Sequence, residues 1–232
     1  MNKIRIALDG PSGAGKSSLA KAIAKKMSIV YVDTGALYRS IGLYVSRQGI
    51  DPKSTEAVSS CLSGISLSLA FNEQGQRVIL NGEDVSDKIR TPEMSMYASA
   101  VSAISAVRAF LLETQRSMAR ENSVIMDGRD IGTVIIPDAE VKIFLVASPE
   151  ARAKRRHAEL LAKGEICTYE EVLADMVERD KNDSGRAIAP AIPAEDAVFL
   201  DNSALSFEDT VEAALAIICD KTGVRGVPDE AV

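Results

Sequence analysis

Hydrophobic residues along the chain form short apolar runs that alternate with stretches of helical spacing. Residues 4–8 make an apolar run that ends in a glycine-rich turn, which predicts a buried strand. In residues 17–27 the apolar positions Leu19, Ile23 and Met27 recur every four residues, the spacing of one helix face. The same alternation predicts an α/β fold with a five-stranded parallel sheet flanked by helices. Further strands are expected at 29–32, 124–127, 141–146 and 197–200. Further helical regions are expected at 34–48, 149–181 and 207–219, and residues 92–120 are expected to form one long helix or two helices.

One segment departs from this alternation and shows a period of two. Leu67, Leu69 and Phe71 alternate with smaller or polar residues, as in a half-buried strand. A second strand-like run is followed by Asn81-Gly82, a dipeptide typical of tight hairpin turns. We predict that residues 62–92 form a small antiparallel β insertion in the α/β chain. The polar tail, residues 220–232, is expected to be frayed.

Composition excludes several classes of protein. The 232 residues include 27 basic and 33 acidic side chains, and the net charge of −6 argues against a protein that coats nucleic acid. There is one histidine, His157, and the three cysteines form no CxxC pair, so a zinc site is not expected. No apolar run reaches the ~18 residues that a membrane helix needs, and the first run is too short for a signal peptide. We expect a cytoplasmic monomer without nucleic-acid or membrane partners.

Residues 10–17, GPSGAGKS, match the phosphate-binding pattern GxxxxGK[ST] at every fixed position. The match follows an expected strand and opens an expected helix, which is the context that the motif requires. Glycines let successive backbone N–H groups point inward, and the helix start adds its positive end. Lys16 can reach the β- and γ-phosphates, and a hydroxyl of Ser17 or Ser18 can bind Mg²⁺. The residues expected to bind ATP phosphates in this P-loop are Gly10, Gly13, Ala14, Gly15, Lys16, Ser17 and Ser18.

The rest of the chain favours a small-molecule kinase among P-loop proteins. A guanine-recognising NKxD segment after a later strand is absent, which argues against a GTP switch. The strand at 124–127 lacks the Asp-Glu pair of many ATPase motors and is followed by Gly128-Arg129-Asp130. A dinucleotide-binding fold is disfavoured because the GxGxxG spacing is missing. Scattered arginines suit a protein that surrounds phosphates.

Three motifs resemble those of bacterial cytidylate kinases: residues 33–39 (DTGALYR), residues 127–133 (DGRDIGT), and Arg179-Asp180 through Asp183 to residues 186–190 (RAIAP). The resemblance spans nearly the whole chain, including the β insertion. It implies a P-loop kinase with a helical lid that transfers the γ-phosphate of ATP to CMP or dCMP, with Mg²⁺ as cofactor. By this resemblance residues 1–232 form one kinase unit, with core segments 1–61, 93–148 and 190–232, an acceptor-binding insertion at 62–92 and an arginine-rich lid at 149–189.

The resemblance also implies an acceptor site. Thr34, Tyr38 and Arg39 match its lining, Ser99 and Arg108 match a base-recognising pair, and Asp130 matches a carboxylate that contacts cytosine. Arg129 and Arg186 match ligands of the acceptor phosphate, and Arg179 and Asp183 match residues near the ribose. The implied CMP-binding set is thus Thr34, Tyr38, Arg39, Ser99, Arg108, Arg129, Asp130, Arg179, Asp183 and Arg186.

Elementary chemistry gives the same roles to several of these residues. Cytosine offers an amine at N4 and acceptors at N3 and O2, which a carboxylate such as Asp130 and a guanidinium such as Arg108 would complement. Arginines suit a monophosphate dianion because guanidinium forks match phosphate oxygens. Other interpretations stay open: Arg129 and Asp130 could form a surface ion pair, and Tyr38 could be a core residue.

Arginines of the expected lid have two interpretations. Arg152, Arg155 and Arg156 share a helix face, where they could form a solvated surface or stabilise charge on the transferring phosphoryl group. We assign Arg152 to ATP phosphate binding and Arg155, together with Lys16, Arg129 and Arg186, to catalysis. No general base is assigned, because the acceptor phosphate is already ionised near neutral pH. His157 is expected to be bystander surface.

Two other functions compete with a cytidylate kinase. One is a related kinase with another acceptor, such as shikimate or UMP. The other is a regulator that binds ATP without catalysis, which consumption of ATP dependent on an added monophosphate would exclude.

Overall fold

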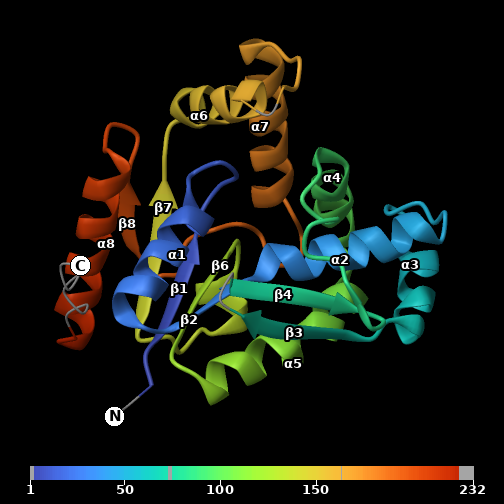
Figure 1. The fold of residues 1–232 in the computed structure, drawn as a ribbon, viewed down its shortest axis with the longest axis horizontal. Helices are drawn as coiled ribbons and strands as arrows, with labels where there is room; N and C mark the ends of the chain where they lie inside the picture. The colour runs from blue at the N-terminus through green and yellow to red at the C-terminus, as the bar shows by residue number, and fades with distance from the viewer. Residues whose placement is uncertain (1–2, 73–74, 163, 225–232) are drawn as a thin grey trace. The chain divides into compact units, whose positions relative to one another are not determined.

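The computed structural model, which describes residues 3–72, 75–162 and 164–224, contains a five-stranded sheet (Figure 1). Its order is β2-β6-β1-β7-β8, and the pairings of β1 with β6, of β1 with β7 and of β7 with β8 are parallel. The predicted parallel sheet is therefore confirmed. The strands are Arg5–Asp9 (β1), Val30–Asp33 (β2), Val124–Gly128 (β6), Val141–Val146 (β7) and Val198–Asp201 (β8).

Contacts within the chain divide it into two compact units. The first comprises Met1–Val30 and Asn122–Val232, and the second comprises Tyr31–Glu121. In the first unit, β1 pairs with β6 and β7, and register places Asp9 beside Gly128 and Phe144. The helices of this unit are Lys16–Met27 (α1), Pro149–Ala162 (α6), Tyr169–Ser184 (α7) and Phe207–Thr222 (α8), with a single π-helical turn at Ile131–Ile135 (η2).

The region 149–181 is helical, as expected, and consists of two helices, α6 and α7, which pack against each other (Figure 1). Thr168 starts α7 with a reciprocal capping box to Glu171, which makes a separate helix favourable here. His157 is not bystander surface: it is half-buried, with Nε2 3.1 Å from the carbonyl oxygen of Cys167. The expected fraying from residue 220 is also wrong at its start, since α8 continues to Thr222; residues 225–232 lie outside the described residues.

The second unit holds the β insertion. Its three antiparallel strands are Leu67–Asn72 (β3), Gly75–Leu80 (β4) and Glu83–Asp84 (β5). Asn81 and Gly82 have φ values of 50° and 82°, the left-handed conformation that a two-residue hairpin turn requires, so the predicted hairpin is confirmed. Around the strands lie Thr34–Arg47 (α2), Thr55–Cys61 (α3), Leu62–Gly64 (η1), Pro92–Val101 (α4) and Ser105–Glu121 (α5).

One helix of this unit was not expected, and the region for which one or two helices were expected contains two. Helix α3 was not predicted, since its seven residues carry little hydrophobic periodicity. The expected helical region at 92–120 is two helices that meet at 102°, and Arg108 Nη1 donates to the carbonyl oxygen of Ser102 at the bend. No single helix in the described residues is long and apolar enough to cross a membrane, although α4 and α5 together pass the test of length and composition.

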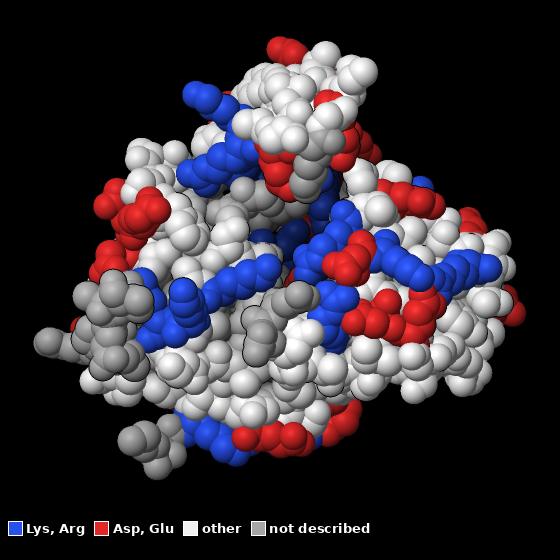
Figure 2. Space-filling model, in the orientation of Figure 1, with Lys and Arg blue, Asp and Glu red and all other residues white. Residues whose placement is uncertain are grey.

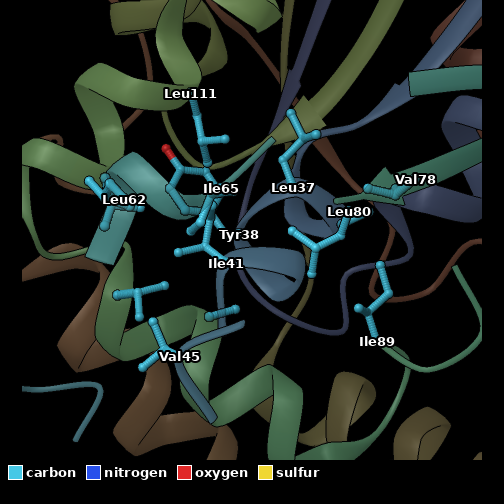
Figure 3. Close-up of a cluster of buried hydrophobic side chains, with 14 of the residues drawn as sticks. Leu37, Tyr38, Ile41, Val45, Leu62, Ile65, Val78, Leu80, Ile89 and Leu111 are labelled. Carbon is cyan, nitrogen blue, oxygen red and sulfur yellow. The ribbon is translucent and has the colours of Figure 1, made fainter. Parts of the chain in front are cut away.

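An apolar core holds the second unit together (Figure 3). Leu37 and Ile41 on α2 are fully buried, and they belong to one cluster with Leu80 of β4 and Leu111 of α5. Tyr38 lies in the same cluster with an exposed fraction of 9%, so the interpretation of this residue as core is confirmed. The acceptor-lining role assigned to its ring stays a prediction.

Charged side chains cover the outside of the insertion, where Figure 2 shows basic and acidic groups next to one another. Arg77 pairs with Asp84 at 2.8 Å and with Asp87 at 2.9 Å, and Arg47 pairs with Glu83 at 2.7 Å. Exposed pairs of this kind contribute little to stability. They keep this small sheet polar on its outer side.

Candidate active site

The glycine-rich loop between β1 and α1 has the backbone geometry of a phosphate cradle. Gly10 has a φ of 145°, and a Cβ there would lie 2.0 Å from the carbonyl oxygen of Leu145, so no other residue fits. Gly15 has a φ of 91° and precedes α1 without a side-chain cap. The first N–H groups of α1 therefore face the loop uncapped, and this helix end favours an anion.

Lys16 lies over this loop. Its ammonium donates to the carbonyl oxygens of Gly10 at 2.8 Å and of Pro11 at 2.7 Å, and the residue is 7% exposed. Burial, followed by the nearby charge of Arg129, lowers the pKa of Lys16 well below its ordinary value. An added phosphate would bring further negative charge to this buried cation, beside that of Asp127 and Asp9.

A hydroxyl and a carboxylate meet at the start of α1. Ser17 Oγ donates to Asp127 Oδ2 at 2.7 Å, and Asp127 is a buried residue of β6. Oxygen ligands of these two kinds suit Mg²⁺, which takes few protein ligands when phosphates are present. In the described residues no group of three or more His, Cys, Asp or Glu side chains could hold a metal by itself.

Two arginines of the predicted acceptor site share one buried carboxylate. Arg129 Nε donates to Asp183 Oδ2 at 2.8 Å, and Arg186 Nη2 donates to the other oxygen at 2.5 Å. Burial acts to raise the pKa of Asp183, but the charges of Arg129 and Arg186 outweigh it and hold that pKa below its ordinary range. The interpretation of Arg129 as half of an exposed ion pair with Asp130 does not hold, since Asp130 is 5% exposed and Arg129 pairs with Asp183.

The lid arginines have three different environments. Arg152 is 2% exposed and donates to the carbonyl oxygens of Ser12 at 2.8 Å and Ala147 at 3.0 Å, while it pairs with Asp180 at 2.6 Å. It therefore connects α6 and α7 to the P-loop.

Arg155 and Arg156 differ from it. Arg155 donates to the backbone and side-chain oxygens of Asn202, at 2.6 and 3.2 Å, and Asn202 Nδ2 donates to the carbonyl oxygen of Ala14 at 3.0 Å. Arg156 forms a pair with Glu159 at 2.9 Å, one helical turn away. The roles of Arg152 and Arg155 toward ATP stay predictions.

The second unit holds the other predicted acceptor residues. Thr34 is 3% exposed and opens α2, whose N-terminus is capped by Asp33 through Ala36 N at 2.9 Å. Arg39 Nη2 lies 2.9 Å from Asp33 Oδ2. Gln76 of β4 hydrogen-bonds to both the N–H and the carbonyl of Asp33, at 2.9 and 3.2 Å. The β insertion is thus tied to the start of α2.

Ser99 and Arg108, the predicted base-recognising pair, both lie in this unit, and both hydrogen-bond to Ser102. The guanidinium carbon of Arg108 lies 5.6 Å from the centre of the Tyr38 ring, within cation–π range. Ser102 connects the pair, because its hydroxyl donates to the carbonyl oxygen of Ser99 at 2.9 Å and its own carbonyl accepts from Arg108.

The sequence analysis assigned no role to five residues that contact the candidate site: Asp9, Asp33, Gln76, Asp127 and Asn202. Asp127 belongs to the motif at residues 127–133, but no role was assigned to it. A carboxylate at the end of a buried strand is the sequence signal that could have identified it. Asn202 and Gln76 carry no such signal, since their partners lie 188 and 43 residues away in the sequence.

Comparison with known proteins agrees with this geometry. The family model described as cytidylate kinase matches residues 6–220. The chain belongs to the cytidylate kinase family. A cytidylate kinase of Fervidobacterium nodosum is 47% identical over 95% of this chain and 99% of its own length, and one of Rhodococcus jostii is 44% identical over 96% and 97%. The chain is thus a nucleoside monophosphate kinase.

A shikimate kinase of Bacteroides thetaiotaomicron has a related solved structure. It aligns with 95% of this chain and 99% of its own, with a TM-score of 0.48 and 13% identity. A likeness at this level carries no information on the acceptor.

Proposed function

We propose that the enzyme transfers the γ-phosphate of ATP to CMP or dCMP and releases ADP with CDP or dCDP. The observation that carries the proposal is a pair of arginines in the unit that holds the P-loop: Arg129 and Arg186 both donate to the buried carboxylate of Asp183. Such a cluster suits two phosphate groups that must approach each other against their own repulsion. Membership of the cytidylate kinase family supports CMP as the acceptor.

The P-loop is proposed to bind the donor. Its N–H groups and Lys16 would hold the β- and γ-phosphates, and Lys16 would exchange its carbonyl partners, Gly10 and Pro11, for phosphate oxygens. Ser17 is proposed as the Mg²⁺ ligand rather than Ser18, because its hydroxyl already contacts Asp127. Mg²⁺ bound there would offset negative charge on the phosphates.

The proposed ligands of the acceptor are the residues that the family resemblance implies. Arg129 and Arg186 would bind the phosphate of CMP, and Asp183 keeps their guanidinium groups together. Asp130 would accept from the cytosine amine, and Arg108 would donate to the ring acceptors. The remaining proposed ligands are Thr34, Tyr38, Arg39, Ser99, Arg179 and Asp183.

Transfer needs positioning and charge stabilisation more than proton removal. The attacking oxygen belongs to a phosphate that is ionised near neutral pH, so no side chain has to act as a base. The arginines and Lys16 would hold the two phosphates in line and stabilise charge as it redistributes.

Lys16→Ala tests the donor side of this proposal. The variant is expected to fold and bind CMP, while kcat falls by a factor on the order of 10³, because a charge on the reacting phosphates is lost. Lys21→Ala is the matched control, since Lys21 lies on the same helix with an exposed side chain. A coupled assay for ADP release, with CMP binding measured by calorimetry, gives both quantities. Near-normal turnover in folded Lys16→Ala would refute the assignment.

A further inference from the structure

Asp9, the last residue of β1, is buried although no charged partner lies within ion-pair distance of it in residues 3–72, 75–162 and 164–224. Its exposed fraction is 4%. Its carboxylate accepts from two backbone amides, Ile131 N at 2.9 Å through Oδ1 and Gly132 N at 2.8 Å through Oδ2. A buried carboxylate is costly, so both of its oxygens are used to hold one short stretch of backbone.

The two amides lie next to residues that are proposed to bind the acceptor. Ile131 directly follows Arg129 and Asp130, and Gly10, the first glycine of the P-loop, directly follows Asp9. Two hydrogen bonds therefore join the start of the P-loop to the segment that carries the proposed ligands of the acceptor. The two partners are 122 and 123 residues away from Asp9 in the sequence.

We propose that Asp9 is a positioning residue for acceptor recognition: its carboxylate fixes the 129–132 backbone, and so sets where Arg129 and Asp130 lie relative to the P-loop. The inference rests on the proposed function, because it assumes that these two side chains contact CMP. Asp9 itself touches neither substrate. It acts by holding backbone, so its loss should affect the acceptor more than the donor.

Asp9→Asn and Asp9→Ala separate this role from general stability. Asn keeps one acceptor oxygen but turns an amino group toward a backbone N–H, and Ala removes both hydrogen bonds. Asp138→Asn is the matched control, since Asp138 is in the same unit with a 72% exposed side chain.

In Asp9→Asn we expect the CMP dissociation constant to rise about tenfold or more, as loss of a charged hydrogen bond implies. The kcat/KM preference for CMP over UMP should fall by a similar factor. ATP affinity measured without CMP should stay within about twofold of wild type, since the P-loop keeps its own backbone geometry. Asp9→Ala should show the same pattern more strongly, and Asp138→Asn should resemble wild type.

Amide hydrogen exchange of the free protein gives a readout independent of activity. Peptides covering 129–135 should exchange faster in Asp9→Asn, while peptides from α8 should not. If Asp9→Ala fails to fold, the measurements on Asp9→Asn alone test the inference. Unchanged CMP affinity, base preference and exchange in a folded Asp9→Asn would overturn the inference while leaving the proposed function intact. A wild type that does not phosphorylate CMP would instead refute the proposed function.

Discussion

Asp9 and Asp33 both end a strand of the sheet and both are buried, with exposed fractions of 4% and 6%, yet they bind different groups. Asp33 accepts from Ala36 N, three residues on, and pairs with Arg39 at 2.9 Å and Arg90 at 3.9 Å. Asp9 accepts only from amides of a distant segment. Asp33 forms ion pairs and caps its own helix, whereas in the described residues Asp9 forms hydrogen bonds to distant backbone amides and no ion pair.

This difference separates two ways to place a functional residue. Asp33 orders the start of its own helix and holds the guanidinium of Arg39 beside it, so residues 33–39 are organised by their own sequence. Asp9 organises residues that are remote in the chain, at the cost of burying a charge. Burial raises the pKa of Asp9 from 3.8 to about 6, against the opposing effect of the Gly132 and Ile131 amides.

The largest effect that the comparison predicts is on pH-dependent stability at Asp9. Because the pKa of Asp9 is raised in the folded protein, its contribution is most favourable below pH 4 and is lost as pH rises through 6. The free energy of unfolding of wild type, relative to Asp9→Asn, should fall by about 2 kcal/mol between pH 4 and pH 7.

Urea unfolding of wild type and Asp9→Asn from pH 4 to pH 7 measures the difference between their free energies of unfolding. The titration of groups that both proteins share cancels in this difference. A constant difference, or one that grows with pH, would mean that the Asp9 carboxylate is ionised in the folded protein without penalty.

A smaller effect is expected at Asp33. Asp33→Ala removes the N-cap of α2, which should lower the free energy of unfolding by about 1 kcal/mol. It also removes the partner of Arg39, so KM for CMP should rise severalfold. Ser206→Ala is the matched control, because Ser206 caps α8 through Asp209 N at 3.0 Å and has no proposed role at the acceptor. Equal KM values in the two variants would assign to Asp33 a role in stability alone.

Much of the fold could be predicted because it depends on local patterns. Hydrophobic spacing located the five strands of the sheet, and Asn81-Gly82 located the hairpin from the backbone conformation that this turn requires. Two helices were one expectation for residues 92–120, but the position of the bend after Val101 was not predicted, because no glycine or proline marks it. Helix α3 escaped because it is short, with one fully buried side chain, Val58.

The site was predictable only where a motif is contiguous. The P-loop depends on glycines within eight residues, and its geometry is encoded in that stretch. Asp9 depends on contact with residues 131 and 132, and Asn202 on contact with residue 14, which a single sequence does not reveal. The hydrogen bonds of Asp9 follow from the sheet order, which places β6 beside β1.

Base selectivity tests the central claim most directly. UMP presents an acceptor where CMP presents the N4 amine, and an N–H where CMP presents N3, so it mismatches both Asp130 and Arg108. Two mismatches predict that wild type prefers CMP over UMP by roughly 30-fold to 10⁴-fold in kcat/KM. dCMP should remain a substrate, since it keeps the base.

The measurement is kcat/KM for CMP, dCMP and UMP with wild type, Asp130→Ala and the exposed control Asp138→Ala. The CMP preference should collapse in Asp130→Ala and persist in Asp138→Ala. Equal use of CMP and UMP by wild type, or full discrimination by Asp130→Ala, would contradict this prediction.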